Sequence, residues 1–354
     1  MDLPFNIFGI GSRPKSHLGI DIGTLSIKIV EISDDNGRPK LENYAMLTNY
    51  DLMTQEAQIK KAFGGKAKIM LERLLKEAGM SAAEVNMSVP IFSSFLTVMD
   101  LPKMSDLELA NAVQFEAKKY IPVSLDTVAI DWSVIGSSAN GNTLVLLIAI
   151  PRELINEYTV IAKETSLKLL AIELETVAAA RALIGNDPVP TMLVDMGSRD
   201  TTVSVVDGGH LQISHSIEMS GEDLTRALAK GLNIDWRRAE ELKKQTGLKI
   251  GESGDQVASI LFPLLNTVTD TIISLMGIYF SKANKKIEKL IIYGGASKMP
   301  GLVEYLNDRL KIDVVVGNSF GRIAYPEKLK SAIGEISHEF TVAIGLALRS
   351  LQQQ

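Results

Sequence analysis

The 354-residue sequence contains no cysteine. This absence excludes disulfide bonds, thiolate metal sites and cysteine nucleophiles, and it is consistent with a reducing compartment. Histidine is scarce as well, and none of the four is paired with another at metal-ligand spacing: His17, His210, His215 and His338. A zinc-type centre is therefore not expected.

Long apolar runs and basic clusters are also missing. The apolar stretches at 144–150 and 268–280 are too short or too interrupted for the roughly 20 residues that cross a bilayer. Residues 1–17 lack the basic region and long apolar core of a signal peptide. The net charge is −5, and no stripe of basic and aromatic residues indicates nucleic-acid binding. These features predict a cytoplasmic protein with no nucleic-acid partner.

The length and the hydrophobic share of 46% favour a globular protein of two lobes. A proline-bounded segment, DPVP at 187–190, is the best boundary between them. Before it, a block at 83–166 reads as strands at 85–90, 93–100, 127–135 and 143–150, with a helix at 105–120. Ser105 and Glu108 form a capping box at the start of that helix. The first sixteen residues form a tail with five large apolar side chains, Leu3, Phe5, Ile7, Phe8 and Ile10.

A first motif interrupts an apolar strand near the N-terminus. The strand within 17–33 breaks at Asp21–Thr24 and then resumes. Gly23 and Thr24 offer backbone N–H groups and a hydroxyl that cradle a phosphate, and Asp21 can hold a metal ion or its waters. Lys28 would add a positive charge, although a solvent-facing strand lysine is an equal alternative.

A second hairpin repeats this design beyond the boundary. Asp195 ends an apolar strand, Gly197 and Ser198 form the turn, and Thr201 opens the next strand. An ordinary β-turn explains either hairpin alone. Two Asp-x-Gly hairpins, one on each side of the boundary, predict a grip on a phosphate chain from opposite sides.

A third motif is a glycine pair that follows an apolar strand at 288–293. Gly294 and Gly295 permit close backbone approach to a bulky ligand group, and Ala296 and Ser297 lead toward a helix. The pattern is neither a Walker A motif nor GxGxxG.

In this order and spacing the three segments resemble the phosphate 1, phosphate 2 and adenosine motifs of the actin, sugar kinase and heat-shock chaperone superfamily. The resemblance implies an α/β, ribonuclease H-like fold of two lobes that binds ATP with Mg²⁺ at Asp21 and Asp195. Glu175 lies where related proteins carry an acidic or amide residue facing the attacking water, so Glu175 and Asp195 are the catalytic candidates. Ala343 and Gly345 resemble the small residues of the second helix at the interlobe hinge.

The remaining nucleotide-binding candidates rest on the same resemblance. Glu240 and Lys243 match a Glu-x-x-Lys pair that contacts ribose and adenine in relatives, with a surface ion pair as the alternative. Ser26 of the first hairpin and Gly221 at a Gly-Glu-Asp helix start complete the set.

The block inside lobe one is similar to the inserted subdomain of FtsA and PilM proteins. The segments 115–132 and 219–229 favour a PilM-type protein, although Val123-Ser124 replaces the Phe-Pro of many relatives. The end of the sequence, LRSLQQQ, does not resemble the amphipathic membrane helix of FtsA. The implied division is a tail (1–16), subdomain 1A (17–82 and 167–188), inserted subdomain 1C (83–166), subdomain 2A (189–221 and 287–336), subdomain 2B (222–286) and an interlobe C-terminal segment (337–354).

The resemblance implies a cytoplasmic ATP-binding scaffold of the type IV pilus machine, at the inner face of the membrane through its partners. The implied partner is the N-terminal peptide of a PilN-like inner-membrane protein. Contacts with other pilus assembly components and with further copies of this chain are also implied. Alternatives are an FtsA-like division or filament-forming ATPase, a secretion-system scaffold and a small-molecule kinase. The sequence shows no Asp-rich acceptor loop of the kind that a kinase would need.

Overall fold

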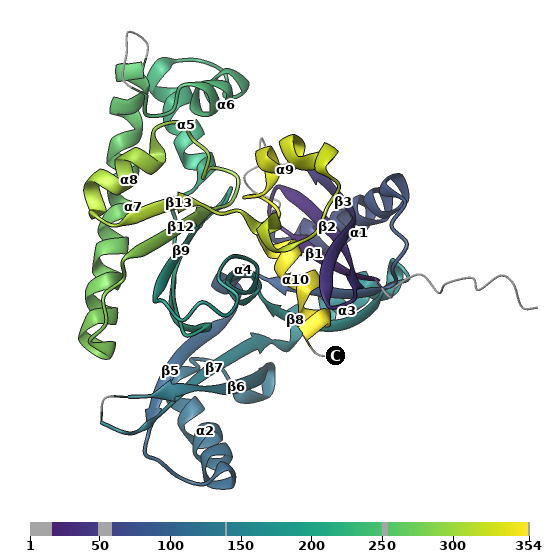
Figure 1. The fold of residues 1–354 in the computed structure, drawn as a ribbon, viewed down its shortest axis with the longest axis vertical. Helices are drawn as coiled ribbons and strands as arrows, with labels where there is room; N and C mark the ends of the chain where they lie inside the picture. Colours follow the sequence, from purple (N-terminus) through teal and green to yellow (C-terminus); the bar gives the residue numbers. More distant parts are fainter. Residues whose placement is uncertain (1–15, 49–58, 139, 250–253, 353–354) are drawn as a thin grey trace, which may run out of the picture.

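The computed structural model describes residues 16–48, 59–138, 140–249 and 254–352. The apolar tail lies outside these residues. The described chain forms two lobes and a smaller block that projects from lobe one (Figure 1).

Lobe one is built on a five-stranded sheet in the order β3-β2-β1-β4-β8. β1, β2 and β3 are antiparallel neighbours, and β4 and β8 continue the sheet in parallel. The strands span Ser16–Ile22 (β1), Ser26–Asp35 (β2), Arg38–Thr48 (β3), Glu84–Val89 (β4) and Lys168–Leu174 (β8). Helices α1 (Ile59–Ala78) and α3 (Arg152–Glu164) cover this sheet. The segment expected as one interrupted strand at 17–33 is thus the hairpin β1–β2.

Lobe two repeats the same strand order, β11-β10-β9-β12-β13. Its strands are Thr191–Met196 (β9), Thr201–Asp207 (β10), His210–Ile217 (β11), Lys289–Tyr293 (β12) and Asp313–Val316 (β13). Its helices are Gly221–Leu232 (α5), Trp236–Gln245 (α6), Gly254–Ala283 (α7) and Leu302–Leu310 (α8). The repeated topology places the β1–β2 and β9–β10 hairpins at equivalent positions in the two lobes.

The projecting block has its own antiparallel sheet, β5-β7-β6, covered by α2. Its elements are Phe95–Leu101 (β5), Asp106–Tyr120 (α2), Val128–Ser137 (β6) and Thr143–Pro151 (β7), and the capping box expected at Ser105 is present. The expected range 83–166 is wider than this block. β4 pairs with β1 and β8, and α3 packs on the lobe-one core, because their apolar faces are buried in that sheet.

Two helices connect the lobes: α4 (Glu175–Leu183) and α10 (Thr341–Gln352). They cross so closely that a Cβ added to Gly345 would lie 1.9 Å from the carbonyl oxygen of Ala178. Gly19 of β1 makes the same kind of approach to Ala343 of α10. The small residues at the crossing therefore let helices and sheet meet backbone to backbone. The short helix α9 (Lys330–Ile336) precedes α10.

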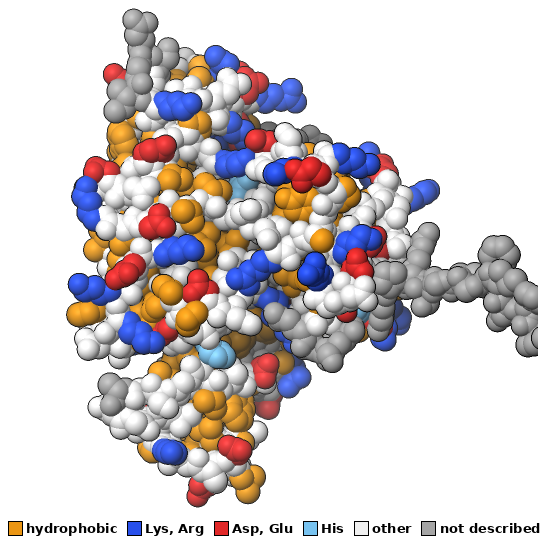
Figure 2. Space-filling model, in the orientation of Figure 1, with side chains coloured by type: hydrophobic (Ala, Val, Ile, Leu, Met, Phe, Trp, Pro, Cys, Tyr) orange, Lys and Arg blue, Asp and Glu red, His pale blue; other side chains and the backbone are white. Residues whose placement is uncertain are grey.

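Helix α7 is long and apolar enough, by length and composition, to cross a membrane. The stretch at 268–280, which was expected to be too interrupted to cross a bilayer, lies within α7. One face of α7 lies in the lobe-two core through Leu261, Leu265, Ile272 and Tyr279, and a core helix meets the same criterion. On the surface shown in Figure 2, Lys and Arg side chains are interspersed with Asp and Glu over both lobes.

Candidate functional site

The turns of the two Asp-x-Gly hairpins meet between the lobes. The hydroxyl oxygens of Thr24 and Ser198 lie 2.6 Å apart, within hydrogen-bond distance. Hairpins separated by about half of the chain are therefore brought together by the tertiary fold, as the repeated motif predicts.

The first hairpin holds one carboxylate beside one ammonium group. Asp21 is opposite Lys28 in the β1–β2 register, and Lys28 Nζ lies 3.6 Å from Asp21 Oδ2. Ser88 of β4 donates a hydrogen bond of 3.2 Å to the other oxygen of Asp21. The turn closes through the Gly23 N–H, which donates to the Ser26 carbonyl oxygen at 3.0 Å. Asp21 is thus fixed in place, and Lys28 is held at the mouth of the turn.

The second hairpin is supported from behind by the start of α5. The N–H groups of Gly221 and Glu222 donate to the carbonyl oxygens of Gly197 and Ser198 at 2.9 and 3.1 Å. Ser220 caps this helix by accepting from the Asp223 N–H. Gly221 therefore helps to hold the second hairpin in position. A direct nucleotide contact by Gly221 stays a prediction.

Four carboxyl groups gather around the two hairpins, those of Asp21, Glu175, Asp195 and Asp200. Burial, together with Asp200 and Asp21, raises the pKa of Asp195 to about 8, and Lys28 acts in the opposite direction. Burial, with the charges of Asp195 and Asp200, raises the pKa of Glu175 well above its usual value. Burial also raises the pKa of Asp200. One lysine does not compensate this cluster, so a cation bound there would be strongly favoured.

Glu175 also connects this site to the projecting block. Its carboxylate accepts a hydrogen bond of 3.1 Å from the Ile91 N–H, where the chain leaves β4 for the block. Ser88, Ile91 and Asp200 were not predicted as part of the site. Ser88 and Ile91 come close to the site only through the tertiary fold, whereas Asp200 lies inside the second turn and could be found from its sequence position.

The glycine turn closes the lobe-two side of the site. Gly294 has φ +88°, and a Cβ at this position would lie 2.3 Å from Asp195 Oδ1. Its N–H donates to the His338 carbonyl oxygen at 2.9 Å, and the Ala296 N–H donates to Met196. The Ser297 hydroxyl donates to Gly294 within the turn. At Gly295 an added Cβ would meet no atom within 4 Å, which leaves open space for a ligand group.

Glu240 and Lys243 are an ion pair in which the lysine side chain is only 7% exposed. The ammonium donates to the Gly221 carbonyl and the Thr225 hydroxyl, both at 2.8 Å, and lies 2.7 Å from Glu240. Burial acts to raise the pKa of Glu240, but Lys243 and Thr225 outweigh it and the pKa is lowered. Because three protein acceptors occupy the three N–H groups of Lys243, its direct role here is to hold α6 against α5.

Within the part of the chain that the structure describes, no group of three or more His, Cys, Asp or Glu side chains is arranged to hold a metal ion by itself. Mg²⁺ commonly takes only one or two carboxylates from a protein and completes its shell with water and phosphate. Asp21 and Asp195, one on each hairpin, offer two carboxyl groups that fit such a cation, which would also favour the charged form of Asp195.

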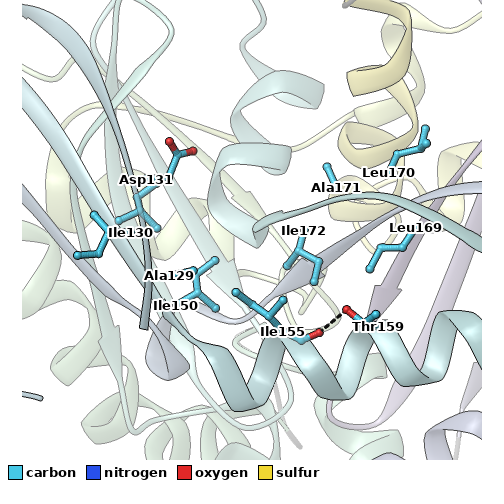
Figure 3. Close-up of a pocket in the computed structure, with 11 residues that line it drawn as sticks. Ala129, Ile130, Asp131, Ile150, Ile155, Thr159, Leu169, Leu170, Ala171 and Ile172 are labelled. Atoms are coloured by element: carbon cyan, nitrogen blue, oxygen red, sulfur yellow. Dashed lines mark hydrogen bonds between the residues drawn. The ribbon is translucent and has the colours of Figure 1, made fainter. Parts of the chain in front are cut away.

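A separate groove lies between the projecting block and lobe one (Figure 3). It encloses about 330 Å³ and is largely apolar. Ile155 and Thr159 of α3 point toward it, opposite Ile150 of β7 and Ile172 of β8. Its lining is Ala129, Ile130, Asp131, Ile148, Ile150, Ile155, Thr159, Leu169, Leu170, Ala171 and Ile172, and it is called the edge groove below.

Comparison with known proteins identifies related chains. A family model described as type IV pilus assembly protein PilM matches residues 19–351. The fold is similar to that of a solved PilM-PilN type IV pilus biogenesis complex, with a TM-score of 0.80 and 24% identity over 95% of this chain and 98% of that chain. It is also similar to MreB5 of Spiroplasma citri bound to AMPPNP, with a TM-score of 0.56 and 14% identity over 97% and 98% of the two chains.

The match to a curated relative covers a much smaller part of the chain. The cell division protein FtsA of Bacillus subtilis (strain 168) is 31% identical over 87 residues, which are 24% of this chain and 20% of that protein. The matched segment thus spans about a fifth of the relative's length. The two-lobed, actin-like α/β fold expected from the sequence is confirmed by the solved structures.

Proposed function

Because the chain belongs to the type IV pilus assembly protein PilM family, we propose that it is an ATP-binding scaffold that docks the N-terminal peptide of a PilN-like membrane protein and responds to its nucleotide. One observation underlies this proposal. Strand β8 lines the edge groove with Leu169–Ile172 and then leads directly to Glu175 in the interlobe site.

The interlobe site supplies contacts for ATP and Mg²⁺. The turns at Gly23–Thr24 and Gly197–Ser198 face each other, as a grip on a phosphate chain requires. Asp21 and Asp195 would hold Mg²⁺ or its waters, and the open backbone at Gly295 would receive the nucleoside. When bound, Mg²⁺ supplies charge that offsets the four carboxyl groups. Glu175, with its raised pKa, is the residue that would orient water for slow hydrolysis.

The edge groove suits an extended peptide. β8 ends the lobe-one sheet and β6 ends the sheet of the projecting block, so both present strand edges toward the groove. Main-chain pairing along such an edge gives affinity, and apolar pockets for alternate side chains give specificity. Leu170, which is 42% exposed, offers part of this surface. The similar solved structure is that of a PilM-PilN complex.

Strand β8 also contacts the two helices that connect the lobes. Glu173 follows the groove residue Ile172 and is buried. Its carboxylate oxygens lie 2.5 and 2.9 Å from the guanidinium of Arg181 in α4, and one lies 2.5 Å from Arg349 in α10. A shift of β8 on peptide binding would therefore move α4 and α10. Nucleotide and peptide would then each shift the equilibrium between the same lobe arrangements, which is how a population shift couples two sites.

Calorimetric titration of the full chain with the N-terminal peptide of its PilN-like protein tests the docking. We expect Leu170→Arg to abolish binding and Ile278→Arg, an exposed apolar residue on α7, to leave it unchanged. Equal affinity in all three proteins would refute the groove assignment.

The coupling is tested by repeating the titration with and without ATP and Mg²⁺. A coupled pair of sites gives a change of about 5-fold or more in peptide affinity, and the same factor for ATP when the peptide is present. We expect Glu173→Gln to reduce this factor. If peptide affinity is the same with and without nucleotide, the protein is a scaffold whose peptide site does not respond to nucleotide, and the coupling is wrong.

A further inference from the structure

The sequence before Ser16 has the pattern of a strand followed by a spacer. Leu3, Phe5 and Ile7 alternate with smaller or polar residues, and Gly11–Lys15 is polar. We propose that residues 3–10 bind in the edge groove of their own chain and compete there with the partner peptide. This inference rests on the proposed role of the groove as a peptide site.

The sheet register places the groove within reach of this segment. Leu18 of β1 pairs with Val85 of β4, and Val85 pairs with Leu169 of β8. Two strand spacings of about 4.8 Å separate β1 from β8, and a strand added at the edge of β8 lies one spacing further, roughly 14 Å from β1. Five extended residues span up to roughly 17 Å, so the spacer 11–15 is long enough to bring residues 3–10 to the edge of β8.

The same register fixes the direction of the bound segment. β1, β4 and β8 are parallel, so the N-terminal ends of β1 and β8 lie at the same end of the sheet. A segment that leaves Ser16 reaches β8 near Lys168 and then follows it toward Leu174, traced from residue 10 back to residue 3. Residues 3–10 would thus run antiparallel to β8, which needs no crossover connection.

The chemistry of the two surfaces is complementary. The edge of β8 offers main-chain groups, and the groove offers Ile150, Ile155 and Ile172 to apolar side chains. In an added strand the side chains of Leu3, Phe5 and Ile7 share one face and enter the groove together. Pro4 lacks an N–H, and such a residue is tolerated in an outermost strand.

Tethering makes weak docking sufficient. A short flexible linker gives an effective concentration on the order of millimolar, so even modest intrinsic affinity keeps the groove filled. The apparent affinity of a partner peptide then falls by the ratio of filled to empty grooves. A lipid surface is a poorer occupant, because the tail offers only Arg13 and Lys15 as basic side chains.

The test uses a fluorescein-labelled synthetic peptide of residues 1–15 and two full-length proteins. One is the wild type, and the other is a tail variant with Phe5→Asp and Ile7→Asp, which cannot fill the groove. We expect fluorescence anisotropy to show the labelled peptide binding the tail variant at least about 10-fold more tightly than the wild type. Leu170→Arg in the tail variant should abolish this binding, whereas Ile278→Arg should not.

The inference would be overturned by equal binding of the labelled peptide to wild type and tail variant, or by binding that survives Leu170→Arg. Sedimentation of the wild type, but not of the tail variant, with phosphatidylglycerol vesicles would also overturn it if the labelled peptide binds neither protein. The experiment also distinguishes a wrong self-docking proposal from a wrong assignment of the groove as the peptide site. If the PilN-type peptide binds wild type and tail variant equally and both lose it with Leu170→Arg, the docking site stands and only the self-docking is wrong.

Discussion

The hydroxyl groups of Thr24 and Ser198 lie 2.6 Å apart, so the turns of two hairpins from different lobes are in direct hydrogen-bond contact. Each turn is supported independently, the first by Ser88 on Asp21 and the second by the start of α5. Under the proposed function, a phosphate chain held between them would separate the two hydroxyls. The distance between Thr24 and Ser198 would then link ligand binding to the arrangement of the lobes.

A pair of cysteines tests this geometry in a chain that has none of its own. We expect the double variant Thr24→Cys, Ser198→Cys to form an intramolecular disulfide on mild oxidation, because hydroxyls in contact place sulfur atoms near bonding distance. Non-reducing electrophoresis and intact mass measure the bond. The oxidised protein should lose ATP binding and regain it on reduction. The single variants are the controls, and a product that is only a cross-linked dimer would contradict the arrangement.

Asp195→Asn should stabilise the protein without ligand, and increasingly so as the pH rises. The folded-state pKa of about 8 lies above the ordinary value of 3.8, so the native state keeps a proton that the unfolded chain loses. Stability from Asp195 is thus fully present below about pH 4 and is lost as the pH rises through about 8. The asparagine side chain carries no charge at any of these pH values and avoids this loss.

Thermal unfolding of wild type and Asp195→Asn measures this effect. The difference in Tm should be larger at about pH 9 than at about pH 5. With ATP and Mg²⁺ the order should reverse, since the variant lacks a carboxylate for the cation. A Tm difference that is independent of pH would show that burial and the neighbouring carboxyl groups do not disfavour the charged form of Asp195.

Lys28→Ala should weaken ATP binding by about 10-fold or more, the cost of a lost hydrogen bond to a charged group. Lys28 Nζ lies at the first hairpin, beside Asp21. Calorimetry with ATP and Mg²⁺ checks the change, and Lys40→Ala, an exposed lysine of β3, is the matched control. Unchanged affinity would assign Lys28 a structural role only.

Gly345→Ala should destabilise the protein by at least about 2 kcal/mol, because the added methyl group has no space. Its Cβ would lie 1.9 Å from the Ala178 carbonyl oxygen, so α10 must move away from α4. Gly334→Ala in α9, where an added Cβ meets no atom within 4 Å, should be neutral or slightly stabilising. Equal Tm values for both variants would mean that the helix crossing is looser than the structure shows.

The sequence alone determined the local chemistry and the family resemblance. Each Asp-x-Gly turn and the glycine pair is a short continuous segment, so the backbone conformation that it needs can be predicted without the fold. The Ser105 capping box and the hairpin at 21–28 are local for the same reason. The repeat of the first motif in the second half of the chain predicted a shared site.

Tertiary structure decided what those residues do to one another. For Glu240 and Lys243 the sequence offered a ligand contact or a surface ion pair; the structure shows a buried ion pair whose lysine holds α6 against α5, and the nucleotide contact stays a prediction. The projecting block is narrower than the expected range 83–166 because β4 and α3 pack into the lobe-one sheet and its core. The carboxyl cluster, the Ile91–Glu175 contact and the edge groove arise from segments far apart in the chain. Their distances and desolvation depend on sheet register and helix crossing, which no local pattern encodes.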